Sequence, residues 1–112
     1  MNIWYRVSDL EAARAFYTEQ LGFQQLYFDE EDRWIRLARG EVEIAISDDE
    51  FAGPPTEEEA VAAVEVADLR AEADRLRESG VKVGTILEIP GTIRLLDVFD
   101  PDGNRLQLTQ DI

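Results

Sequence analysis

Residues 6–23 read RVSDLEAARAFYTEQLGF, and this stretch decides the fold because its pattern returns in the second half of the chain. The tetrad VSDL at residues 7–10 has a counterpart, VADL, at residues 66–69, which begins 59 positions later. Each tetrad leads into a helical stretch that ends at a glycine, Gly22 or Gly80. A repeat of about half the chain length predicts one structural unit that is built twice.

Both helical stretches carry their own start and stop signals. Ser8 or Asp9 can cap the first helix and Asp68 can cap the second, because a short polar side chain accepts a hydrogen bond from the first helical turn. A glycine suits the left-handed residue at which many helices end. Apolar residues recur at helical spacing, as Leu10, Ala13, Phe16, Tyr17 and Leu21 in the first helix and as Leu69, Ala73 and Leu76 in the second. We expect two amphipathic helices, each covering one side of a sheet.

The remaining segments alternate apolar and polar residues, as strands do. The predicted strands are 2–7, 23–28, 34–38 and 41–46 in the first half, and 61–66, 81–87, 93–99 and 105–110 in the second. Residues 47–59 are acidic and contain Gly53-Pro54-Pro55, so they predict a linker. The sequence therefore predicts an α+β protein in a single domain over 1–112, with module one at 1–46, linker 47–59 and module two at 60–112.

Composition excludes several classes of function. The chain has 112 residues, of which 45% are hydrophobic, and it contains no cysteine, so it has no disulfides and no thiol nucleophile. No apolar run reaches membrane-spanning length, and Met1 leads directly into a strand-like segment, so we expect a cytoplasmic protein. A net charge of −14 disfavours nucleic acid and anionic lipid as partners, and it attracts cations.

The chain also contains no histidine, which is the commonest metal ligand and the usual general base near neutral pH. Catalysis by serine–histidine or cysteine–histidine pairs is therefore excluded. A metal site would have to use Asp, Glu, Asn or Gln, and such ligands favour hard cations over zinc.

The helix-start tetrad, the Phe16-Tyr17 pair, the LGF ending at 21–23 and the late FDPDGNRLQLTQ at 99–110 resemble the vicinal-oxygen-chelate superfamily. This group includes glyoxalase I, bleomycin-resistance proteins, fosfomycin-resistance enzymes and extradiol dioxygenases. The resemblance implies two βαβββ modules whose curved mixed sheets enclose a cleft, with one helix on the outer face of each sheet. It also implies a homodimer, with modules paired within one chain or between two.

Metalloenzymes of that superfamily place one ligand on each of four strands. The resemblance assigns these positions to Asn2, Glu43, Val61 and Gln107. Valine cannot coordinate a metal, and one carboxylate with two amides carries too little charge for a hard-cation site. We therefore expect no metal and no other cofactor.

Strand alternation assigns side chains to the sheet face that is turned away from the helix. The residues predicted to lie there and to contact a ligand are Trp4, Arg6, Trp34, Arg36, Glu43, Glu65 and Gln107. Two tryptophans among a few polar groups are typical of a small-molecule site, since a tryptophan can stack on a planar ligand or hold a cation over its ring. The alternative is that the tryptophans belong to a core or dimer interface, and that the charged residues form cross-strand ion pairs.

Three functions are compatible with these features. The leading hypothesis is a metal-free small-molecule-binding protein that sequesters a cationic or planar antibiotic such as bleomycin. The second is a glyoxalase- or dioxygenase-like enzyme with a remodelled active site, which could use metal or could use Glu43 or Glu65 as a base. The third is a non-catalytic structural or regulatory subunit. The sequence favours a protein that is not an enzyme.

Overall fold

The structure is a computed structural model that describes residues 3–49 and 61–112. Asn2, residues 50–59 of the predicted linker and residue 60 of the predicted second module lie outside the described residues. The chain forms two compact units, Met1–Ala62 and Ala63–Ile112, and each is described by itself. Among the described residues, none of the helices combines the length and the apolar character that crossing a bilayer requires.

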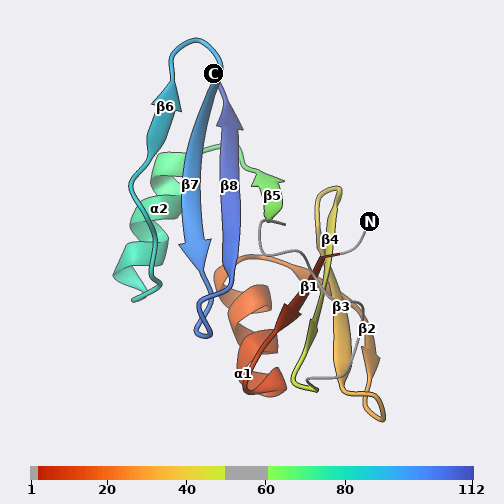
Figure 1. Cartoon of the computed structure of the whole chain (residues 1–112). Helices are drawn as coiled ribbons and strands as arrows, with labels where there is room; N and C mark the ends of the chain where they lie inside the picture. Colours follow the sequence, from red (N-terminus) through yellow and green to blue (C-terminus); the bar gives the residue numbers. More distant parts are fainter. Residues whose placement is uncertain (1–2, 50–60) are drawn as a thin grey trace. The chain divides into compact units, whose positions relative to one another are not determined.

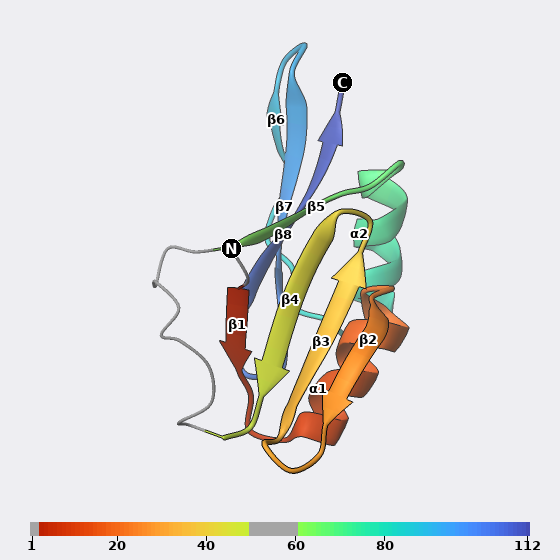
Figure 2. The same ribbon diagram turned by 90° about the vertical axis from the view of Figure 1, so that its right-hand side faces the viewer.

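The first unit contains a mixed four-stranded sheet with the order β1-β4-β3-β2. Its strands are β1 (Ile3–Arg6), β2 (Gln24–Asp29), β3 (Trp34–Arg39) and β4 (Val42–Ser47). The edge strand β1 pairs with β4 in parallel, and the other pairs are antiparallel. Helix α1 (Leu10–Ala15) and the π-helical turn η1 (Phe16–Gln20) lie on one side of this sheet (Figure 2).

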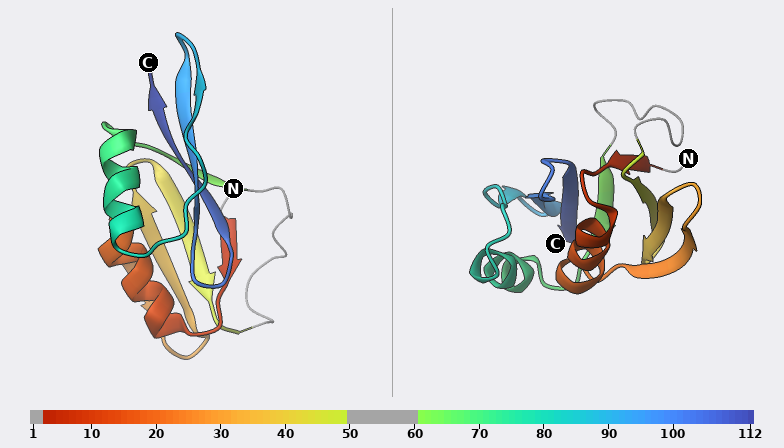
Figure 3. Two further views of the ribbon diagram at one scale, coloured as in Figure 1. Left: turned by 90° about the vertical axis from the view of Figure 1, so that its left-hand side faces the viewer. Right: turned by 90° about the horizontal axis from the view of Figure 1, so that it is seen from below.

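The second unit repeats this arrangement with the order β5-β8-β7-β6. Its strands are β5 (Ala62–Glu65), β6 (Leu87–Ile89), β7 (Ile93–Phe99) and β8 (Arg105–Asp111) (Figure 1). Helix α2 (Leu69–Glu78) lies on one side of the sheet only (Figure 3). The α+β fold of two βαβββ modules is therefore confirmed.

The helix caps follow the sequence prediction. The Asp9 carboxylate accepts a hydrogen bond from the Ala12 amide at 3.1 Å, and Asp68 accepts the equivalent bond from Ala71 at 3.1 Å. Gly22 and Gly80 have φ angles of 69° and 81°, which only glycine adopts without strain. The predicted stripes are buried, apart from Phe16, which stays partly exposed because the helix widens into a π turn from this residue onward.

One predicted strand is wrong. Residues 81–87 were expected to pair throughout, but β6 covers only Leu87–Ile89. Val83 forms a single isolated bridge with Val98, and the Gly84 amide donates to the Asp97 carbonyl at 2.9 Å. Residues 82–84 therefore follow β7 without forming a regular strand, and the chain then departs from the sheet before β6 begins.

Candidate functional site

The face of the first sheet that is turned away from α1 is called here the first helix-free face. Alternation along β1 and β4 places buried side chains such as Tyr5, Ile44 and Ile46 against the helix. The ring of Tyr5 stacks on Tyr17 of η1, with centroids 6.3 Å apart. The side chains between these residues along each strand must therefore point the other way.

Three aromatic rings gather on the first helix-free face. The centroids of Trp4 and Trp34 are 5.4 Å apart, and those of Tyr27 and Trp34 are 5.1 Å apart. Both pairs are tilted, by 47° and 48°, which is a favourable geometry for aromatic rings. Tyr27 is 47% exposed, so the cluster is presented at the surface.

An ion pair lies beside the aromatic cluster. The Arg36 Nε atom is 2.9 Å from the Glu43 Oε1 atom, and both side chains are more than a third exposed. Ala45 on β4 pairs with Arg36 of β3 on one side and with Trp4 of β1 on the other. Because exposed ion pairs contribute little to stability, a ligand can compete for either partner at small cost.

Arg6 lies on the same face, at the end of β1. It pairs by register with Ser47, which stands opposite Trp34. One Arg6 guanidinium nitrogen, Nη1, donates to the Asp49 carbonyl at 3.2 Å. The structure thus brings Trp4, Trp34, Arg36 and Glu43 together, with Arg6 at the margin.

The remaining two predicted site residues lie in the second unit. Glu65 is exposed on β5, and Gln107 lies on β8, on the face of the second sheet turned away from α2. This second helix-free face carries a polar row in which Gln107 Nε2 donates to Asp97 Oδ1 at 3.3 Å. Because the two units are described separately, a cleft enclosed by the two sheets stays a prediction.

Two residues of these faces were missed by the sequence prediction, Tyr27 and Asp97. A β-bulge between Gln25 and Tyr27 shifts the register so that Tyr27 pairs with Arg36. Strict alternation would have turned Tyr27 towards the helix, so the bulge is what exposes it. Asp97 could have been found by the same alternation argument, since the buried residues Leu96 and Val98 flank it.

Equivalent backbone hydrogen bonds show which residues of the two modules correspond to each other. The Val7 amide donates to the Ser47 carbonyl at 3.0 Å, and the Val66 amide donates to the Thr109 carbonyl at 2.7 Å. Counting back two residues from these acceptors makes Ala45 the equivalent of Gln107. The assignment of the fourth-strand ligand position to Glu43 is therefore corrected to Ala45, because the turns that precede β4 and β8 differ in length.

This correction removes a carboxylate from the set of metal-ligand positions. Of that set, the described residues are now Ala45, Val61 and Gln107, and Gln107 alone has a side chain that can coordinate a metal. Within residues 3–49 and 61–112, no group of three or more Asp, Glu, His or Cys side chains could hold a metal ion.

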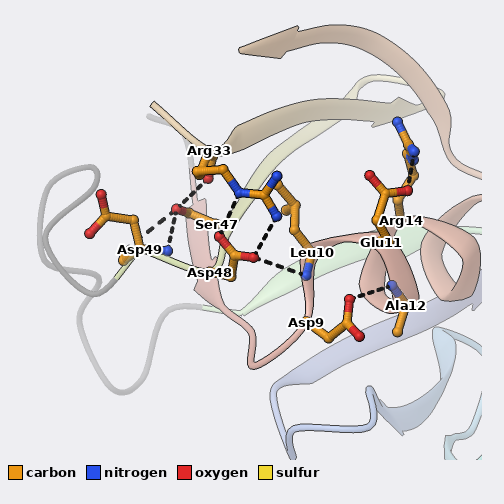
Figure 4. Close-up of polar contacts among 9 residues, drawn as sticks. All are labelled: Asp9, Leu10, Glu11, Ala12, Arg14, Arg33, Ser47, Asp48 and Asp49. Atoms are coloured by element: carbon orange, nitrogen blue, oxygen red, sulfur yellow. Dashed lines mark hydrogen bonds and ion pairs between the residues drawn. The ribbon is translucent and has the colours of Figure 1, made fainter. Parts of the chain in front are cut away.

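A separate polar cluster fixes the start of α1 (Figure 4). Asp48 Oδ2 accepts from the Leu10 amide at 3.3 Å and from Arg33 Nη2 at 2.8 Å. The hydrogen bond from Arg33 lowers the pKa of Asp48, against an opposing effect of desolvation, and the same bond raises the pKa of Arg33. Ser47, fully buried, donates to the Arg33 carbonyl at 2.7 Å, so this cluster holds the sheet and helix together.

Two mixed sheets, each of four strands and each covered by one helix, define a protein that contains two βαβββ modules. The model of the Glyoxalase/Bleomycin resistance protein/Dioxygenase superfamily matches residues 2–108. The chain therefore belongs to this superfamily.

Solved structures support the same assignment. TnmS3, an antibiotic binding protein from Streptomyces sp. CB03234, is 28% identical, with a TM-score of 0.78 over 100% of this chain and 96% of that chain. A putative glyoxalase family protein from Bacillus anthracis is 24% identical, with a TM-score of 0.77 over 99% and 91%. The fosfomycin resistance protein FosX from Listeria monocytogenes is 16% identical, with a TM-score of 0.78 over 100% and 92%. The last two likenesses show the fold alone, and a search of curated protein sequences gives no match.

Proposed function

We propose that this protein binds a planar, cationic small molecule on the first helix-free face, without a metal ion, and that an antibiotic is the natural ligand. The observation that carries the proposal is the cluster of Trp4, Tyr27 and Trp34, in which the Trp34 ring centroid lies 5.4 Å from that of Trp4 and 5.1 Å from that of Tyr27. Adjacent aromatic rings that are at least partly exposed offer a flat ligand a large contact area at low entropic cost.

Charge supports the choice of a cation. Aromatic faces attract cations through the ring quadrupole, and Glu43 lies beside the rings as a carboxylate that a ligand cation can approach. The net charge of −14 adds a long-range attraction for positively charged molecules. The likeness to TnmS3, described as an antibiotic binding protein, favours an antibiotic over other planar cations. The homodimer and the cytoplasmic location stay predictions from the sequence.

The test is a titration monitored by tryptophan fluorescence, with bleomycin as the first probe and a panel of planar cationic antibiotics after it. The Tyr27→Leu variant removes one ring but keeps both tryptophans as reporters. We expect its affinity to fall about fivefold to tenfold, because an aromatic contact contributes about 1 to 1.5 kcal/mol. Tyr27→Phe keeps the ring and should bind as the wild type does.

Two other results would contradict the proposal. If no probe in the panel quenches fluorescence or raises the melting temperature, the protein is better described as a structural or regulatory subunit. If purified protein contains stoichiometric metal and turns over a substrate, it is an enzyme with a remodelled site.

A further inference from the structure

The two helix-free faces differ in chemistry although they arise from one repeat. In the first unit Arg36 stands between Tyr27 and Ala45 by register. In the second unit the equivalent position is Asp97, which lies between Gly84 and Gln107. An aromatic surface in one module is thus replaced by an acidic and polar surface in the other. The two helix-free faces therefore offer different chemistry to a ligand.

Asp97 is held in place and still presented to solvent. Gln107 donates to its Oδ1 atom at 3.3 Å, while Arg105 Nη1 is 3.7 Å from its Oδ2 atom, which is too long for a hydrogen bond. The Asp97 side chain is 34% exposed. A carboxylate has about four acceptor positions, so Asp97 retains acceptor capacity towards a ligand.

Gly84 leaves one flank of this carboxylate open. The φ angles of Gly22, Gly40, Gly80, Gly91 and Gly103 are positive, whereas that of Gly84 is outside the left-handed range, so its backbone does not require glycine. A Cβ atom at Gly84 would lie 3.6 Å from the Cβ atom of Asp97, in ordinary contact. Gly84 therefore leaves space beside the Asp97 side chain, although its backbone conformation does not require a glycine.

Two cations lie one row away from Asp97. Phe99 stands opposite Arg105 by register, and the Lys82 Nζ atom is 5.1 Å from the centroid of the Phe99 ring. The Phe99 amide also donates to the Lys82 carbonyl at 3.0 Å, which keeps Lys82 beside β7. This corner of the second face therefore holds two positively charged side chains, although the chain as a whole has a net charge of −14.

The row on the other side of Asp97 is apolar on β6 and β7 and continues on β8 with Thr109, which stands opposite Leu95. Leu87 and Leu95 are directly paired across β6 and β7, and Leu87 is 61% exposed. The second face thus presents, in successive rows, a basic edge at Arg105, an acidic centre at Asp97 and an apolar edge at Leu87.

We propose that the second helix-free face binds an amphoteric small molecule with the chemistry of an apolar α-amino acid. Its ammonium group donates to Asp97, its carboxylate lies against Arg105 and Lys82, and its apolar side chain covers Leu87 and Leu95. Because Asp97 and Arg105 are 3.7 Å apart, the two charges of the ligand must also be close together. A purely cationic ligand meets repulsion from Arg105 and Lys82, and a purely anionic one meets repulsion from Asp97. This site goes beyond the proposed antibiotic binding and does not depend on it.

The test compares three probes of the same apolar shape by NMR: L-leucine, 4-methylpentanoate without the amine, and 3-methylbutylamine without the carboxylate. We expect saturable shifts of the Gly84, Asp97 and Gln107 amides with L-leucine. Each analogue should bind about tenfold more weakly, the usual effect of removing a hydrogen bond to a charged group. Absence of saturable shifts with L-leucine, or equal affinity for all three probes, overturns the proposal.

Variants separate the site from general charge effects. Asp97→Asn keeps the shape and should weaken L-leucine binding about tenfold, since it removes the charged acceptor. Asp74→Asn on α2 removes the same charge from a side chain that is 76% exposed and should leave binding unchanged. Gly84→Ala should weaken binding while the melting temperature stays the same. An equal loss in Asp97→Asn and Asp74→Asn contradicts a specific role for Asp97. Because these readouts come from amides of the second unit, they are independent of the fluorescence test on the aromatic cluster.

Discussion

Asp48 and Gln110 hold equivalent positions in the two modules, but one is a carboxylate and the other an amide. Asp48 accepts from the Leu10 amide at 3.3 Å, and Gln110 Oε1 accepts from the Leu69 amide at 3.0 Å. Both bonds tie the last strand of a sheet to the start of its helix. The charged version also binds Arg33, at 2.8 Å. The same kind of hydrogen bond therefore joins strand and helix in both modules, but only in the first module is the acceptor, Asp48, a group that can lose its charge.

Asp48→Asn should lower the stability of the protein at neutral pH and leave its fold intact. The asparagine oxygen can still accept from Leu10, but the ion pair with Arg33 is lost. We expect the melting temperature at pH 7 to fall by about 3 °C, the scale at which one modest interaction moves a domain of this size. Asp74→Asn, on the exposed surface of α2, serves as the control and should change the melting temperature much less.

The effect of Asp48→Asn should depend on pH in one direction. Since Arg33 lowers the pKa of Asp48, the charged carboxylate stabilises the fold fully above its unfolded pKa of about 3.8. That contribution is lost as the pH falls through the lower pKa of the folded state. Urea unfolding should show a larger difference between wild type and variant at pH 6 than at pH values below the unfolded pKa, where the difference shrinks as the pH falls. A difference that stays constant over this range would exclude titration of Asp48 as its cause.

Exchanging either member of the Arg36–Glu43 ion pair should have opposite effects on a cationic ligand. Arg36→Gln frees the carboxylate of Glu43 and removes a repelling charge, so affinity should rise about threefold to fivefold. Glu43→Gln removes the attracting charge, so affinity should fall by a similar factor, in line with an exposed pair contributing less than about 1 kcal/mol. Both changes should shrink when the salt concentration is raised, because exposed charges are screened. Fluorescence titration at two salt concentrations measures this, and a shift of both variants in the same direction would rule out Glu43 as the anchor.

The repeat, the helix caps and the faces of β1, β4, β5 and β8 could be predicted from sequence because these segments alternate regularly. The prediction failed where the backbone departs from this rule. At Leu26 one extra residue in β2 reverses the direction of Tyr27. Residues 82–84 are joined to β7 only by one isolated bridge and separate backbone hydrogen bonds. The alternation of apolar residues in the sequence is the same for such a segment as for a regular strand. Irregularities of this kind depend on pairing partners distant in sequence, and a local pattern does not contain them.

Removing metal should leave the protein unchanged. The ligand positions described in the structure hold Ala45, Val61 and Gln107, and an alanine and a valine cannot coordinate an ion. Dialysis against a chelator should therefore leave the melting temperature and the fluorescence titration the same, and elemental analysis should find no divalent ion at stoichiometric level. A divalent ion that remains bound at stoichiometric level after this dialysis would contradict the metal-free proposal directly.

The aromatic cluster can be tested without any ligand. Trp4 and Trp34 are the only two tryptophans of the chain, and their ring centroids are 5.4 Å apart with an interplanar angle of 47°. Two indoles this close and this tilted couple their excited states. The far-ultraviolet circular dichroism spectrum should therefore contain a pair of bands of opposite sign that arises from the two indoles. Trp4→Phe and Trp34→Phe should each abolish both bands equally, because a single indole has no partner. Two separate bands that are lost one at a time would show that the rings are apart in solution. The aromatic cluster on which the proposed ligand site depends would then not exist.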